Sequence, residues 1–219
     1  MRAVAVAPRP ADAVLSCGGT LAGLAAGGWR VTLVALEAGD AAREAADLLG
    51  LAEVVDVGVR RTAPEEVAAA LGPAIDAEHA DRILAPLGLG GRPEHAAVVA
   101  ALGWLRHPAP VVRWRDVPDA LEQRITRPRP GEQAIPIARQ LERKLDACVP
   151  FAGALGGEAA MRAALRAFHE QEGRRLGVDG PAEVLVEPPP DPRRERARRE
   201  EARRQEQAAM AKLRAQLRG

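Results

Sequence analysis

Two segments far apart in the chain contain the residue types that carry out chemistry in proteins. A proline-rich turn at 8–12 holds Arg9 and Asp12, and a glycine-rich stretch at 87–95 ends in Arg92 and His95. Aspartate and histidine serve as metal ligands and acid–base groups, whereas arginine keeps its proton and supplies a fixed positive charge. Two arginines beside helix N-termini are also suited to bind a carboxylate or a phosphate.

Apolar segments of strand length alternate with segments of helix length in the first half of the chain. The expected strands, rich in Val, Ile or Leu, are Arg2–Ala7, 30–36, 54–57, Arg82–Pro86 and Val111–Trp114. The expected helices between them are 12–26, 41–49, Pro64–Glu78 and 93–106. This alternation predicts an α/β fold, a Rossmann-like three-layer sandwich with a mainly parallel sheet.

Ligands in such sheets bind beyond the carboxyl ends of the strands. The loops 8–12, 37–43 and 87–95 are expected at this edge. We expect Asp40, Arg43 and Asp116 on the rim of the same pocket, although Asp40 could equally cap the helix that follows it.

The order of these motifs resembles the LmbE/PIG-L superfamily of zinc-dependent de-N-acetylases. The family turn Pro-His-Pro-Asp-Asp corresponds to Pro-Arg-Pro-Ala-Asp at 8–12, which Gly-Gly-Thr-Leu-Ala follows at 18–22. The family pattern Pro-Leu-Gly-x-Gly-Gly-His-Pro-Asp-His resembles the sequence at 86–95. Weaker similarities at 39–45, 114–118 and 144–148 extend the resemblance over residues 2 to 187.

The resemblance implies a site from which the catalytic groups have been removed. The family's three zinc ligands fall on Arg9, Asp12 and His95, its general base on Ala11, and its oxyanion-stabilising His on Arg92. A catalytic zinc needs about three protein ligands and an open position, and a guanidinium has no lone pair to give. Asp12 and His95 therefore remain as metal ligands only if a metal is retained, and we expect no catalytic residue and little deacetylase activity.

Three outcomes are open for this converted pocket. The Arg9 guanidinium could fill the metal position and pair with Asp12, which would otherwise be buried without a partner. The two arginines could bind a small anionic ligand. Altered catalysis could instead use a metal held by Asp12, His95 and a third group, or His95 and the arginines without a metal.

We therefore expect a catalytically degenerate LmbE/PIG-L deacetylase-like protein, a pseudoenzyme that acts as a partner subunit or as an anion- or ligand-binding module. A role in a specialised biosynthetic pathway is expected by analogy alone. No cofactor is expected. The alternative is a PIG-L family hydrolase, an N-deacetylase or amidase on an N-acyl amino sugar or a thiol conjugate, with zinc in an altered site.

The composition changes after the Pro-Pro-Pro at 188–190, which predicts an α/β domain at 1–190 and a charged helical tail at 191–219. Residues 193–219 hold ten Arg or Lys and four Glu, a net charge of +6, within a chain whose total is +1. Met210, Leu213 and Leu217 form an apolar seam on this helix. The tail is expected either to be solvated or to bind a partner protein or a second copy of the chain. Because no aromatic residues interleave the basic ones, no nucleic-acid binding is expected.

The remaining features indicate a soluble, cytoplasmic protein that does not bind a membrane. No signal peptide and no run of 18 apolar residues is present. Cys17 is expected to be a buried apolar residue, and a disulfide with Cys148 is only weakly supported. His79, His107 and His169 are expected at the surface. Later elements are expected as helices at 134–148 and Glu158–Arg175 and an extended segment at 184–186.

Overall fold

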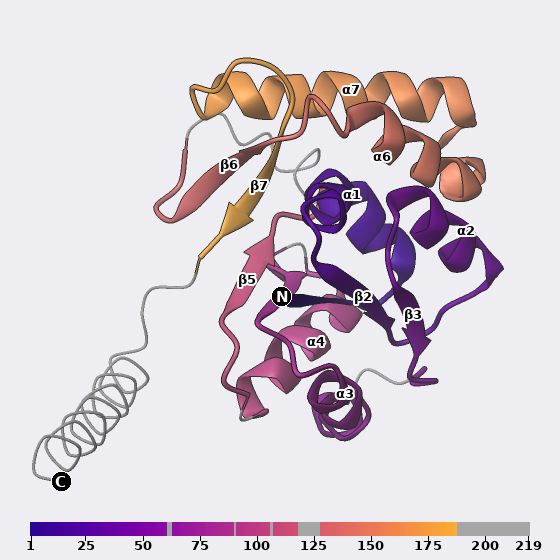
Figure 1. Cartoon of the computed structure of the whole chain (residues 1–219), viewed down its shortest axis with the longest axis vertical. Helices are drawn as coiled ribbons and strands as arrows, with labels where there is room; N and C mark the ends of the chain where they lie inside the picture. Colours follow the sequence, from indigo (N-terminus) through magenta and orange to yellow (C-terminus); the bar gives the residue numbers. More distant parts are fainter. Residues whose placement is uncertain (61–62, 90, 106, 118–127, 188–219) are drawn as a thin grey trace, which may run out of the picture. The chain divides into compact units, whose positions relative to one another are not determined.

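The strands pair into one sheet in the order β3-β2-β1-β4-β5-β7-β6 in this computed structural model (Figure 1). The structure describes residues 1–60, 63–89, 91–105, 107–117 and 128–187. The strands are β1 Arg2–Ala7, β2 Arg30–Ala35, β3 Glu53–Asp56, β4 Arg82–Pro86, β5 Val111–Trp114, β6 Glu132–Pro136 and β7 Ala182–Val186. The first five run parallel, whereas β7 is antiparallel to both β5 and β6.

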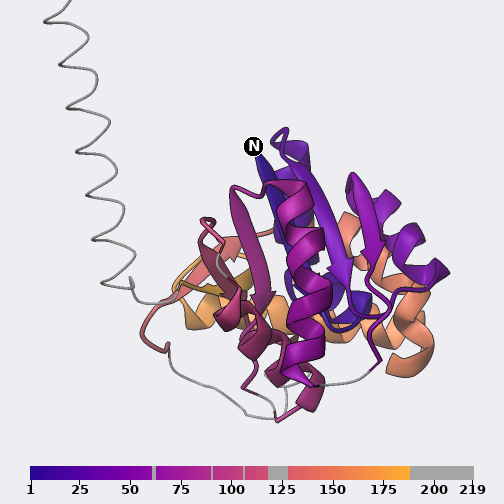
Figure 2. The same cartoon turned by 90° about the horizontal axis from the view of Figure 1, so that it is seen from below.

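Helices cover both faces of the sheet, which makes the three layers that the sequence predicts (Figures 1 and 2). One face carries α1 Pro10–Ala26, α2 Asp40–Leu49 and α6 Leu141–Cys148, and the other carries α3 Pro64–Glu78 and α4 Pro93–Trp104. Alternation along β1 explains this double burial, because successive side chains of a strand point to opposite faces. Ala3 and Ala5 belong to the core under α1, while Val4 and Val6 belong to the core under α3 and α4.

The expected helix at 134–148 is wrong in its first half. Residues Glu132–Pro136 form β6, and the helix α6 begins at Leu141. Pro136 explains the difference, because a proline inside a helix removes one hydrogen bond and clashes with the preceding turn. The strand β6 instead lies at the sheet edge, where it pairs with β7 from Glu132 to Pro136.

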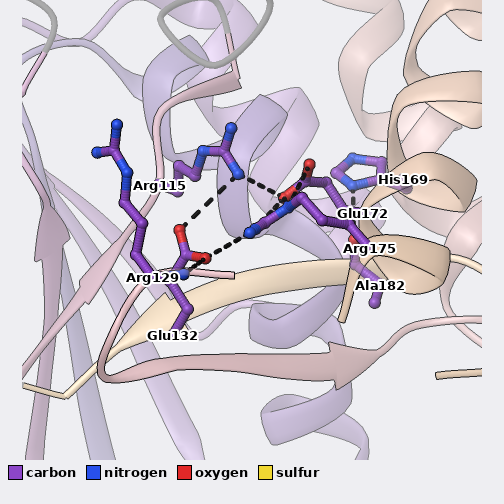
Figure 3. Close-up of polar contacts among 7 residues, drawn as sticks. All are labelled: Arg115, Arg129, Glu132, His169, Glu172, Arg175 and Ala182. Carbon is purple, nitrogen blue, oxygen red and sulfur yellow. Dashed lines mark hydrogen bonds and ion pairs between the residues drawn. The ribbon is translucent and has the colours of Figure 1, made fainter. Parts of the chain in front are cut away.

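The 3-10 helix η1, Val149–Leu155, leads into the helix α7, Glu158–Arg175, whose bounds match the prediction. A buried ion-pair network joins α7 to β6 and to the residue after β5 (Figure 3). Glu172 and Arg175 of α7 contribute to it, together with Glu132 and Arg115. The network contains two cations and two anions, so its charges balance.

Contacts divide the chain into a unit at Met1–Glu187 and a second at Pro188–Gly219. The predicted charged helix of the tail lies outside the described residues, so the tail and its domain boundary stay predictions. Among the described helices, none is both long and apolar enough to cross a membrane.

Candidate functional site

The site begins where β1 ends and α1 starts. Pro10 occupies the first turn of α1 and Arg9 is its N-cap, so Asp12 lies in the first helical turn. The Asp12 Oδ2 atom accepts a hydrogen bond from the Arg9 backbone N–H at 3.2 Å. A carboxylate is favourable here because unpaired N–H groups and the helix dipole give an N-terminus a positive potential. Asp12 is thereby fixed at the carboxyl edge of the sheet, and it is 7% exposed.

Arg92 and His95 reach Asp12 from the neighbouring strand–helix connection. The strand β4 lies beside β1, and Arg92 is the N-cap of the helix α4 that follows β4. The Arg92 Nη1 atom lies 3.4 Å from Asp12 Oδ1, and His95 Nε2 lies 3.3 Å from Asp12 Oδ2. The sequence motifs at 8–12 and 87–95 therefore do meet, as their places after adjacent parallel strands predict.

Asp116 completes the group from the end of the next strand. It follows β5, and its Oδ1 atom lies 3.3 Å from His95 Nδ1 and accepts a hydrogen bond from Trp114 Nε1 at 3.1 Å. The neighbouring Val117 backbone N–H donates to Ser16 Oγ of α1 at 3.1 Å. Asp116, which we expected on the rim of a pocket, is thus a buried partner of His95.

His95 sits between two carboxylates and is 1% exposed. Burial alone would lower its pKa, but the contacts with Asp116 and Asp12 outweigh burial and raise the pKa of His95 to about 10. At neutral pH its ring is therefore an imidazolium, which has no lone pair for a metal and cannot accept a proton as a general base.

The structure gives Arg9 and Arg92 different roles from those expected. Arg9 is exposed, and its backbone contacts Asp12, while the guanidinium beside the Asp12 carboxylate is that of Arg92. The extended conformation of the N-cap residue turns the Arg9 backbone toward Asp12. Of these two arginines, Arg92 is therefore the one whose guanidinium lies beside Asp12.

Asp40 and Arg43 are not brought into this group by any contact that the structure shows. Arg43 Nη1 lies 3.3 Å from Asp40 Oδ1, and both side chains are exposed at the start of α2. Ala11, at the position of the missing base, packs against the apolar core.

The donor set of this site does not fit a catalytic zinc. Asp12 and His95 are two potential ligands, but the guanidinium of Arg92 lies against the first and carboxylates flank both nitrogens of the second. Among the described residues, no group of three or more His, Cys, Asp or Glu side chains is arranged to hold a metal ion.

A second buried polar cluster, which the sequence patterns did not predict, lies on the α1 face of the sheet. Glu183 of β7 accepts the backbone N–H groups of Gly19 and Thr20 at 2.8 and 2.7 Å, beside a kink of α1 at Cys17. Lys144 Nζ donates to Glu183 Oε1 at 2.6 Å. The prediction that His169 is solvated is wrong, because His169 is fully buried with its Nε2 atom 2.6 Å from Lys144 Nζ.

The contacts within this cluster determine the tautomer and the charge of the His169 ring. Its Nδ1 lies 3.1 Å from the Ala182 carbonyl oxygen, so Nδ1–H donates there and Nε2 accepts from Lys144. Burial first, and then the Lys144 charge, lower the pKa of His169 well below its ordinary value. His169 is therefore neutral, and the cluster is a structural brace rather than a second reactive site. The similarity at 144–148 was the available signal for Lys144.

Two further expectations concern single residues. His107 was expected at the surface, but it is 7% exposed, with Nδ1 2.9 Å from the Ala109 carbonyl oxygen, while His79 is exposed as expected. Cys17 and Cys148 are both buried and unlinked, so the possible disulfide is not formed.

Solved structures share this fold. A triple mutant of the deacetylase Orf2 of teicoplanin biosynthesis matches with a TM-score of 0.70 and 21% identity, over 85% of this chain and 97% of the other. N,N'-diacetylchitobiose deacetylase from Pyrococcus horikoshii matches with a TM-score of 0.58 and 16% identity, over 85% and 84%. The 4-carboxy-2-hydroxymuconate hydratase GalB from Pseudomonas putida KT2440 matches with a TM-score of 0.66 and 20% identity, over 87% and 97%.

These matches confirm the predicted α/β fold, which the chain shares with known deacetylases. No family model matches the chain. No curated protein matches it either. Since the same fold supports both deacetylases and a hydratase, the function has to be argued from the site itself.

Proposed function

We propose that this chain is a catalytically degenerate protein with a de-N-acetylase fold that binds a small anionic ligand rather than hydrolysing an amide. One observation carries the proposal: the guanidinium of Arg92 lies against Asp12, at a point that solutes can reach. The Arg92 side chain is 34% exposed, whereas that of Asp12 is 9% exposed. A dissolved ligand would thus reach the guanidinium of Arg92 more readily than the carboxylate of Asp12.

The absence of a base at position 11 supports loss of hydrolysis. General acid–base help is typically worth about 10²- to 10⁴-fold in rate, and Ala11 cannot supply it. The raised pKa of His95 keeps that ring protonated at neutral pH, so it cannot replace the missing base. The remaining chemistry is charge recognition, for which an arginine and a helix N-terminus suit a carboxylate or a phosphate.

The test combines an activity assay with a binding assay on the full chain. Release of free amine from N-acetylglucosamine is measured with and without added zinc, and binding of inorganic phosphate and acetate is measured by titration calorimetry. We expect no amine release, and phosphate binding about tenfold or more weaker in R92A, because a hydrogen bond to a charged group contributes about 1.5–3 kcal/mol.

R43A is the matched control, since Arg43 also lies 3.3 Å from an aspartate but on an exposed helix start. It should bind phosphate as the unaltered chain does. Zinc-dependent amine release would instead establish the alternative, an amide hydrolase with an altered metal site. Anion binding that R92A and R43A change equally, or that is not detected, would contradict a ligand site at Arg92.

The partner-subunit role stays a separate proposal that rests on the composition of residues 193–219. Deleting this segment should release a co-purifying partner or change the oligomeric state in gel filtration. Unchanged elution and composition would contradict it.

A further inference from the structure

Arg113 of β5 is a partly buried arginine for which the described residues supply no carboxylate. Its Nη1 atom donates to the Pro86 carbonyl oxygen at 3.4 Å, and the described part of the chain gives its side chain no other polar contact. Burial lowers the pKa of the Arg113 guanidinium from its ordinary value. Because a charge removed from water without a counter-charge costs stability, this arrangement needs an explanation.

The arginine two residues later shows what a structural arginine looks like in this part of the fold. Arg115 Nη1 lies 2.6 Å from Glu172 Oε2 and 3.9 Å from Glu132 Oε1, and all three side chains are less than a tenth exposed. The chain therefore provides acidic partners for the buried cation at 115 and leaves the one at 113 without them.

Arg113 lies at the same edge of the sheet as the site around Asp12. It pairs in register with Ala85 of β4, and its guanidinium reaches one residue further, to Pro86, where β4 ends. The connection that begins there leads to Arg92 at the start of α4. The two arginines thus belong to adjacent strands, about 5 Å apart, at the carboxyl edge where ligands of such sheets bind.

The charges at this edge sum to an excess of one positive charge. The carboxylates of Asp12 and Asp116 are balanced by Arg92 and the charged ring of His95, and Arg113 adds one cation more. A guanidinium has five N–H donors in a planar fork that matches a carboxylate. Arg92 uses a donor on Asp12 and keeps others, so each arginine can accept a carboxylate of a ligand.

We propose that Arg113 is a second ligand-binding residue of this site, and that the ligand is a small dicarboxylate with one carboxylate on Arg92 and the other on Arg113. This inference rests on the proposed anion-binding function and names its ligand class. An arginine retained for a ligand lowers the stability of the free chain, so its removal should cost affinity without costing stability.

The experiment measures binding of acetate, malonate, succinate and glutarate to the full chain by titration calorimetry at low ionic strength, and thermal melting without ligand. We expect at least one dicarboxylate to bind about tenfold or more tightly than acetate, and R113M to abolish this difference. Without ligand, R113M should melt at or above the temperature of the unaltered chain, whereas R115M should melt lower because it breaks a buried network.

R143M is the matched control for binding, since the Arg143 guanidinium also donates to a carbonyl oxygen, that of Leu48, but on an exposed position of α6. It should bind each dicarboxylate as the unaltered chain does. Equal weakening by R113M and R143M would overturn the inference. So would a lower melting temperature of R113M, or its failure to fold, because Arg113 would then serve the structure.

The same titrations separate this inference from the function on which it rests. If no dicarboxylate binds more tightly than acetate and R92A weakens them all, the anion site stands and the second contact at Arg113 is wrong. If no carboxylate binds to the unaltered chain, both are wrong.

Discussion

A histidine between two carboxylates holds its proton more strongly than a histidine beside one carboxylate. Carboxylate oxygens of Asp12 and Asp116 lie 3.3 Å from opposite nitrogens of His95, so a charged ring has an anion beside each nitrogen. Neutralising the ring would leave one nitrogen lone pair facing a carboxylate in a buried position. This repulsion, added to the lost attraction, explains why the pKa of His95 is raised despite burial.

Replacing Asp116 tests this account. In D116N the side chain keeps its size and loses its charge, so we expect the pKa of His95 to fall by roughly 1 to 3. The measurement is an NMR titration of the imidazole resonances, assigned by comparison with H95Q. D40N is the control, since the Asp40 carboxylate is exposed and contacts Arg43. An unchanged His95 titration in D116N would show that Asp116 does not set the charge of this ring.

At the residue scale, the sequence predicts which loops come together better than it predicts where each side chain points. The meeting of Asp12 with His95 follows from their places after adjacent parallel strands. The choice between Arg9 and Arg92 does not, because it depends on the backbone conformation of one N-cap residue. The burial of His169 was equally out of reach, since it depends on Lys144, which lies 25 residues earlier in the chain and itself contacts Glu183.

The elements of the first half of the chain were predictable because each carries its own signals. Alternation of apolar and capping residues defines β1 to β5 and α1 to α4 to within a few residues. The strand β6 was not predictable in this way. Its residues are only partly buried or exposed, and its strand conformation comes from pairing with β7, which is about 50 residues later.

The helix α7 carries two Glu–Arg pairs of very different burial, which gives a test at the scale of the element. Glu172 contacts Arg115 and Arg175 with side chains that are all less than a tenth exposed, whereas the Glu158 side chain, which contacts Arg162, is 54% exposed. Removing one partner of a buried pair leaves an uncompensated charge and typically costs about 3–5 kcal/mol.

We therefore expect E172Q to lower the free energy of unfolding by about that amount, measured by urea denaturation. E158Q, on the same helix, should lower it by about 1 kcal/mol or less, as exposed pairs do. Equal effects of the two substitutions would show that the network in Figure 3 does not anchor α7 to the sheet.

At the scale of the whole molecule, two buried histidines limit the pH range in which the fold is stable. His95 is charged in the folded protein and His169 is neutral. The pKa of His95 is raised from 6.5 to about 10, so its stabilising contribution is complete below about 6.5 and is lost as the pH rises toward 10. The pKa of His169 is lowered below 6.5, so the unfolded chain binds a proton that the folded chain does not. That difference costs stability as the pH falls below about 6.5.

Two variants separate these contributions, because each removes one titration. Relative to the unaltered chain, H95Q should flatten the decline of the free energy of unfolding between pH 6.5 and 10. H169Q should flatten the decline below pH 6.5, while its amide can still donate to the Ala182 carbonyl and accept from Lys144. The measurement is urea denaturation across pH, and the slope, rather than the absolute stability, carries the result. Parallel curves for all three proteins would mean that both rings titrate alike in the folded and unfolded chain, contrary to their environments here.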